Sequence, residues 1–234
     1  MTVHVPPWAN PEKDPRYPHL MKCFTDFLSA VRDEKAPLDF FSFHCYDRPD
    51  FAEKQIAYCR KTLDDYGFTA TEMSLNEWLP CDGGGRMSDL GTPRQTAEIA
   101  AMLCLMQNGP VDDAEIYDAK ARGGAYAPLF APETRQPRKA YYVFLAFNEL
   151  RKLGRAVKLP AAPEGLWACA ASDGEGNAAM LVANDTKRPI PLPYDFGAYR
   201  IVRSRVIDAT RTFDDAPLAA VVGPETTWLL TLER

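Results

Sequence analysis

The chain has 234 residues, of which 46% are hydrophobic and 25% are charged, and its formal net charge is −5. These proportions are typical of a soluble globular protein with one large domain or two smaller ones. The acidic balance and the lack of a Lys/Arg cluster argue against a nucleic-acid partner, and no apolar run reaches the roughly 18 residues that predict a membrane span.

The six cysteines stand singly, without the CxxC pairs or the spacing that predict a zinc site. Buried thiols in a reduced compartment are the favoured interpretation. Residues 1–16 are polar and Pro-rich and do not resemble a signal peptide, so we expect a cytoplasmic protein.

Helical and strand-like patterns alternate after an expected N-terminal loop at residues 1–18. The periodicity predicts a sequence of elements that ends near residue 157: helix 20–31, strand 38–44, helix 50–66, strand 68–76, helix 93–107, strand 114–117 and helix 138–153. Gly67 is expected to close the second helix as its C′ residue. This order implies a parallel sheet with right-handed crossovers.

The character of the chain changes after a Pro-rich stretch at residues 160–163. Short strands separated by turn residues are predicted at 166–171, 178–183, 199–207 and 227–232. Residues 158–234 are therefore expected to form a small antiparallel sheet or sandwich. Residues 19–157 hold three βα units, whereas a full barrel has eight in about 250 residues. This part is either a small open sheet or the last three-eighths of a barrel.

The most informative motif is Asn76-Glu77-Trp78, which lies where the second predicted strand gives way to a loop. Barrel enzymes keep catalytic groups at the C-terminal ends of parallel strands. A Glu there can be a nucleophile, a general base or a solvated loop residue. A large ring such as Trp78 at the mouth of a pocket suits stacking on the apolar face of a sugar.

Glu72 is the competing carboxylate in this strand. Strict alternation places Glu72 with Asn76 on one face and Glu77 with Leu75 on the other, and the pattern does not say which face is inward. Position favours Glu77, because Glu72 lies near the start of the strand.

The preceding strand ends in His44 and Tyr46, which share a side if the strand stays extended. Tyr46 could donate a hydrogen bond to Glu77, while His44 alone is more often a satisfied rim residue. A carboxylate, an imidazole and a phenol at one rim suit sugar chemistry, so we expect a carbohydrate substrate.

Asp118 follows the third strand. It is expected either to bind substrate or, as the slightly preferred interpretation, to form an ion pair with Lys120 or Arg122. The glycines at 83–85 lack the GK[ST] ending of a phosphate loop and the dinucleotide-binding spacing, so a loop over the rim is favoured. No pattern predicts a metal site, a cofactor or a Ser/His/Asp hydrolase elbow.

Four segments resemble the C-terminal part of a clan A retaining glycosidase, most closely glycoside hydrolase family 39, which includes β-xylosidases and α-L-iduronidase. Residues 37–46 resemble the family's sixth strand, residues 71–78 its seventh, and residues 126–130 with 136–142 the run into its eighth helix. The region after residue 160 is similar to the sandwich that follows the barrel. The likeness covers about residues 19–234.

The resemblance implies that Glu77 is the nucleophile of a xyloside-type hydrolase. It implies that His44 and Tyr46 orient the nucleophile or bind the sugar, and we expect Asn76 and Trp78, which flank Glu77, to bind the substrate as well. The family usually reads Thr-Glu-Trp-Asn at this point, which the motif around Glu77 does not match. The acid/base residue of the family comes from the fourth strand, which has no counterpart here, so a missing N-terminal half or a second chain is the expected partner.

Two other interpretations stay open. The chain could be a non-catalytic module that binds carbohydrate or a protein partner. It could also be a small open α/β enzyme of another class that uses Glu77 and His44 as a catalytic pair.

Overall fold

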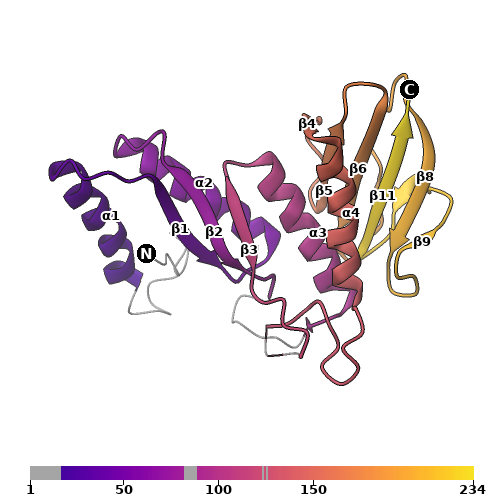
Figure 1. Ribbon diagram of the computed structural model, residues 1–234, viewed down its shortest axis with the longest axis horizontal. Helices are drawn as coiled ribbons and strands as arrows, with labels where there is room; N and C mark the ends of the chain where they lie inside the picture. The colour runs from indigo at the N-terminus through magenta and orange to yellow at the C-terminus, as the bar shows by residue number, and fades with distance from the viewer. Residues whose placement is uncertain (1–16, 82–88, 123, 125) are drawn as a thin grey trace. The chain divides into compact units, whose positions relative to one another are not determined.

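The computed structural model describes residues 17–81, 89–122, 124 and 126–234 (Figure 1). These residues form two compact units that alternate along the sequence. The first unit holds the described residues up to Leu79 together with Gly109–Tyr117, and the second holds Pro80–Asn108 and Asp118–Arg234. The predicted glycine loop and residues 1–16 lie outside the described part of the chain.

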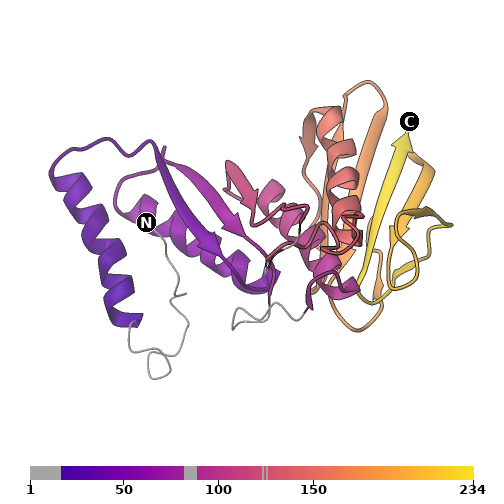
Figure 2. The same ribbon diagram turned by 60° about the horizontal axis from the view of Figure 1, so that its bottom comes forward.

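The first unit is a parallel sheet with helices on one face (Figure 2). Its described strands pair in the order β1-β2-β3. The elements are α1 (Tyr17–Asp33), β1 (Phe40–Cys45), α2 (Pro49–Asp65), β2 (Glu72–Trp78) and β3 (Asp113–Ile116). Phe24 of α1 stacks on Phe41 of β1 with ring centroids 4.9 Å apart, and it also meets Tyr58 of α2 edge to face.

Side chains of β1 and β2 alternate between a buried and an open side. Phe41 and Met73 are buried on the helix-covered side, whereas Phe40 on the other side is 61% exposed. Because alternate residues of a strand point to opposite faces, these positions fix the direction of their neighbours. Glu72 therefore lies on the open side.

A register shift interrupts this alternation in β2. Ser42 pairs with Ser74, but the next pair is His44 with Glu77, so three steps along β2 match two along β1. The same extra residue appears against β3, between Leu75 and Trp78. Such a bulge changes the side on which the following residues point.

The end of α2 was predicted correctly at Gly67. The amide of Gly67 donates to the carbonyl of Asp64 over 2.9 Å, and the amide of Phe68 donates to that of Leu63 over 2.9 Å. This pair of bonds is a Schellman motif, in which the C′ residue needs a positive φ. Gly67 supplies a φ of 91°.

The second unit contains an antiparallel sheet whose described strands run in the order β4-β5-β6-β11-β8-β9. A short ribbon pairs β7 with β10. The elements are α3 (Pro93–Asn108), α4 (Lys139–Leu153), β4 (Arg155–Val157), β5 (Leu166–Ser172), β6 (Asn177–Asn184), β7 (Ile190–Pro191), β8 (Arg200–Ile207), β9 (Asp214–Asp215), β10 (Val221–Val222) and β11 (Thr226–Glu233).

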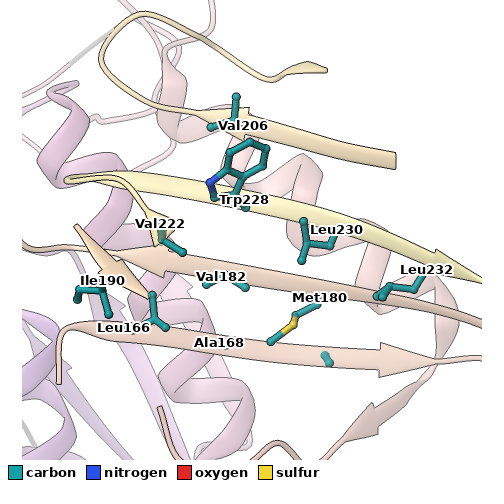
Figure 3. Close-up of a cluster of buried hydrophobic side chains, with 11 residues drawn as sticks. Leu166, Ala168, Met180, Val182, Ile190, Val206, Val222, Trp228, Leu230 and Leu232 are labelled. Atoms are coloured by element: carbon teal, nitrogen blue, oxygen red, sulfur yellow. The ribbon is translucent and has the colours of Figure 1, made fainter. Parts of the chain in front are cut away.

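The six-stranded sheet is covered differently on its two faces. Helices α3 and α4 pack on one face, where Cys104 of α3 contacts Cys169 of β5. The other face carries a buried apolar cluster that includes Trp228 and the ribbon residues Ile190 and Val222 (Figure 3). The predicted sandwich is thus a large sheet with helices on one side and a small ribbon on the other.

This packing differs from the predicted boundary at residue 157. Helices α3 and α4 were expected to belong with the parallel strands, but both pack on β5 and β6. Helix α3 is buried along its whole length from Gln95 to Met106, as its apolar sequence predicted. None of the described helices is both long and apolar enough to cross a membrane.

Candidate active site

Glu77 is held through a single carboxylate oxygen. The hydroxyl of Tyr46 donates a hydrogen bond to Oε2 of Glu77 over 2.8 Å, which confirms the expected contact. Nδ1 of His44 lies 3.1 Å from the same oxygen. No described residue donates a hydrogen bond to Oε1 of Glu77. The Glu77 side chain is 33% exposed, so part of it is open to solvent.

The bulge in β2 explains how Glu77 reaches these partners. Strict alternation had placed Glu77 on the side of Leu75, which is fully buried, and that expectation was wrong. The register shift pairs Glu77 with His44 and turns its side chain toward the half-buried side of β1. Trp78 then resumes the alternation and points into the core.

Two residues that sequence reasoning missed support the site. Gln55 of α2 is only 6% exposed, and its Nε2 donates to the backbone carbonyl of His44 over 3.0 Å. Tyr117 follows β3 and meets the ring of Tyr46 edge to face, with centroids 6.4 Å apart. Neither residue carries a local sequence signal, because each role depends on how β1 packs against α2 and β3.

Trp78 does not lie where the stacking role requires. Its side chain is 1% exposed, so the ring offers no open face to a sugar. The physical reason is the bulge, which places Glu77 on the accessible side and the next residue in the core.

Asp118 belongs to the second unit and pairs with a neighbour. Its Oδ2 lies 3.2 Å from Nζ of Lys120, as the preferred interpretation predicted. Its Oδ1 accepts the amide of Lys120 over 3.1 Å. The ion pair with Lys120 explains the charge and position of the Asp118 side chain, so no bound substrate is needed to explain them.

A hollow of about 430 Å³ opens on the side of the first unit that carries Phe40. We call this side the open face. Asn76 is part of it, and its buried Oδ1 accepts no hydrogen bond from the described residues. The lining residues are Phe40, Ser42, Glu72, Met73, Ser74, Asn76, Asp112, Asp113 and Glu115. Across the described residues, no three His, Cys, Asp or Glu side chains gather closely enough to hold a metal ion.

The sequence matches no known family in a scan of family models, and no curated protein matches it. Solved structures do share its fold. A glucosidase from Croceicoccus marinus superposes with a TM-score of 0.66 at 18% identity, covering 89% of this chain and 56% of the glucosidase. A GH39 β-xylosidase from Caulobacter crescentus superposes with a TM-score of 0.62 at 16% identity, covering 90% of this chain and 54% of the β-xylosidase.

A GH30 endoxylanase from Clostridium papyrosolvens C71 gives a TM-score of 0.58 at 14% identity, covering 84% of this chain and 49% of the endoxylanase. The chain thus spans about half the length of each of these three proteins. At these identities the likeness establishes the fold: the chain folds like part of a glycoside hydrolase. The predicted resemblance to family 39 is confirmed at that level.

Proposed function

We propose that this chain is part of a retaining glycoside hydrolase in which Glu77 is the nucleophile. The observation that carries the proposal is the anchoring of Glu77 through Oε2 alone, by Tyr46 and His44, at the C-terminal end of a parallel strand. The glycoside hydrolases that share the fold support this choice of chemistry. Because a β-xylosidase and an endoxylanase are among them, xylosides are the first substrates to test.

In the proposed reaction, Oε1 of Glu77 attacks the anomeric carbon of the sugar. The glycosidic carbon–oxygen bond breaks, and the leaving oxygen takes a proton from a second carboxyl group. Water then attacks the same carbon, returns a proton to that carboxylate and releases Glu77. Tyr46 and His44 hold Oε2, so that Oε1 keeps its direction throughout both steps.

The second carboxyl group must stand about 5–5.5 Å from the nucleophile. We assign it to polypeptide outside these 234 residues, since the chain spans about half the length of the proteins that share its fold. The DNA upstream of codon 1 provides a direct test. An open frame of about 150 or more residues with an Asn-Glu pair at a strand end is expected. A stop codon close upstream would favour the non-catalytic binding module.

Covalent labelling tests the role of Glu77 itself. A dinitrophenyl fluoroxyloside carries a leaving group that departs without a proton, so it needs no acid. The purified chain is expected to gain one sugar on the peptide that contains Glu77, and Glu77→Gln is expected to gain none. Glu72→Gln is the matched control and should label like the wild type. Labelling of another residue, or of Glu77→Gln, would refute the assignment.

A further inference from the structure

We propose that Asp47 binds a hydroxyl group of the sugar at the candidate active site, through its carboxylate oxygen Oδ2. Asp47 directly follows Tyr46, whose hydroxyl donates to Glu77. It lies in the short loop between β1 and α2, and β1 is parallel to β2, so this loop leaves the sheet at the same edge as Glu77. Barrel enzymes bind their substrates at this edge. The inference rests on the proposed function, because it adds a residue to the same site.

The carboxylate of Asp47 has few partners within the chain. Its Oδ1 accepts the backbone amide of Arg48 over 2.8 Å. No described residue donates a hydrogen bond to Oδ2, and no described Lys or Arg side chain forms an ion pair with Asp47. The residue is half-buried. One oxygen of a half-buried carboxylate is thus left without a donor from the described part of the chain.

The charge of Asp47 is unfavourable in the folded chain. Burial raises the pKa of Asp47 to about 6, and Asp50 adds to the shift. A carboxylate that loses water without gaining a cation or further donors costs free energy, and groups of this kind gather at sites where a ligand binds. The bond to the Arg48 amide does not explain the charge, because a neutral Asn would accept that bond equally. Arg48 is the N-cap residue of α2, so Asp47 lies outside the helix.

A sugar hydroxyl is a suitable donor for Oδ2 of Asp47. An ionised carboxylate only accepts hydrogen bonds, and a bond from a hydroxyl to a carboxylate is stronger than one between neutral groups. Consecutive Cα atoms are about 3.8 Å apart, so a xyloside positioned for attack by Glu77, which Tyr46 holds, is expected to bring hydroxyl groups close to Asp47. The bound hydroxyl would provide the donor that the described chain does not.

Asp47→Asn separates a binding role from a structural one. The variant keeps the shape of the side chain and an acceptor for the Arg48 amide, but it removes the charge. At a pH above the pKa of Asp47, binding of xylobiose is expected to weaken at least about tenfold. The melting temperature is expected to rise at the same pH, because the folded state no longer holds an unpaired carboxylate. A residue with a structural role alone would not raise the melting temperature while weakening binding.

Asp50→Asn is the matched control. Asp50 is exposed in the first turn of α2, and the variant makes the same change in charge close to Asp47. It should leave the affinity for xylobiose unchanged and lower the melting temperature slightly, since a carboxylate stabilises a helix N-terminus. Xylobiose is titrated into the full chain, and amide chemical shifts report both the affinity and the residues in contact. The amides around Asp47 and Glu77 are expected to shift.

Four results would overturn the binding role of Asp47. Xylobiose could fail to bind the wild type, Asp47→Asn could bind it with unchanged affinity, or the two variants could weaken binding equally. Release of nitrophenol from an aryl xyloside that Asp47→Asn abolishes would make Asp47 the missing acid instead. Weaker xylobiose binding by Asp47→Asn, without labelling of Glu77 in the wild type, would keep the binding residue and reject the nucleophile. Unchanged xylobiose binding with normal labelling of Glu77 would do the reverse.

Discussion

The environment of Glu77 is asymmetric, because Tyr46 and His44 both contact Oε2 and none of the described residues donates a hydrogen bond to Oε1. A carboxylate fixed at one oxygen has lost much of its rotational freedom before a substrate arrives, which reduces the entropic cost of attack. Tyr46 provides the shorter of the two contacts, and it comes from the neighbouring segment after β1. The same contact ties the end of β2 to that segment.

Replacing Tyr46 by Phe should therefore lower the free energy of unfolding by about 1 kcal/mol, because one hydrogen bond to a half-buried carboxylate is lost. Urea unfolding followed by circular dichroism measures the change. Tyr199→Phe is the control, since the Tyr199 hydroxyl makes no hydrogen bond with the described residues. Equal losses in the two variants would show that the Tyr46 hydroxyl contributes nothing specific.

Glu98 of α3 is a second carboxyl group whose surroundings set its charge. Its side chain is 4% exposed and pairs with Arg94 at 3.0 Å. The pKa of Glu98 is raised to about 7, chiefly by burial; Arg94 opposes the shift, and Asp185 and Asp89 add smaller contributions to it. The folded state therefore holds a proton that the unfolded chain, with a pKa near 4.5, has already released.

This difference makes stability fall as the pH rises. Between pH 4.5 and about 7 the folded state binds one more proton than the unfolded state. The free energy of unfolding therefore falls as the pH rises through this range, by about 3 kcal/mol in total. Glu98→Gln cannot titrate and should lose this dependence. Urea unfolding at several pH values measures this dependence, with Glu164→Gln, a change at an exposed residue, as control. Identical pH profiles for Glu98→Gln and the wild type would contradict the assignment.

At the scale of the elements, α2 ends on a conformation that only glycine adopts easily. A Cβ at position 67 would meet nothing within 4 Å, so space is not the constraint. The φ of 91° at Gly67 is the constraint. Gly67→Ala should therefore cost about 1–2 kcal/mol in thermal or urea unfolding. Gly67→Asn should cost less, because Asn tolerates positive φ better. If Gly67→Ala left the free energy of unfolding unchanged, the backbone at the end of α2 would have relaxed to accommodate the added Cβ.

The elements also show what the sequence can predict. The hydrophobic periodicity located the main helices and the long strands, and glycine chemistry located the end of α2 at Gly67. The places of His44, Tyr46 and Glu77 at the ends of neighbouring strands correctly predicted that the three side chains lie together. Their roles in binding and catalysis stay predictions, as do the carbohydrate partner and the cytoplasmic location.

The failures have physical causes. A bulge adds one residue without any change of composition, so alternation placed Glu77 on the side of Leu75. The stacking role expected of Trp78 took its place next to Glu77 as a sign of exposure, whereas the ring is buried. The apolar sequence of α3 predicted burial but could not name the surface that buries it, which is the antiparallel sheet. Gln55 and Tyr117 reach the site only through packing between distant segments.

At the scale of the whole molecule, the proposed reaction needs a carboxyl group that we assign outside the chain. The purified chain should therefore release no nitrophenol from an aryl β-xyloside, because that leaving group still benefits from protonation. A colorimetric assay over hours measures release. Activity that disappears in Glu77→Gln would show that the chain carries its own acid.

The order of strands in the large sheet has a consequence for biosynthesis. Strand β11 comes after the other described strands in the sequence, yet it lies inside the sheet, between β6 and β8. While the ribosome is still translating this region, β6 and β8 have no common partner, and the apolar side chains that β11 later covers stay in contact with water. The sheet can close only after the final strand has left the exit tunnel.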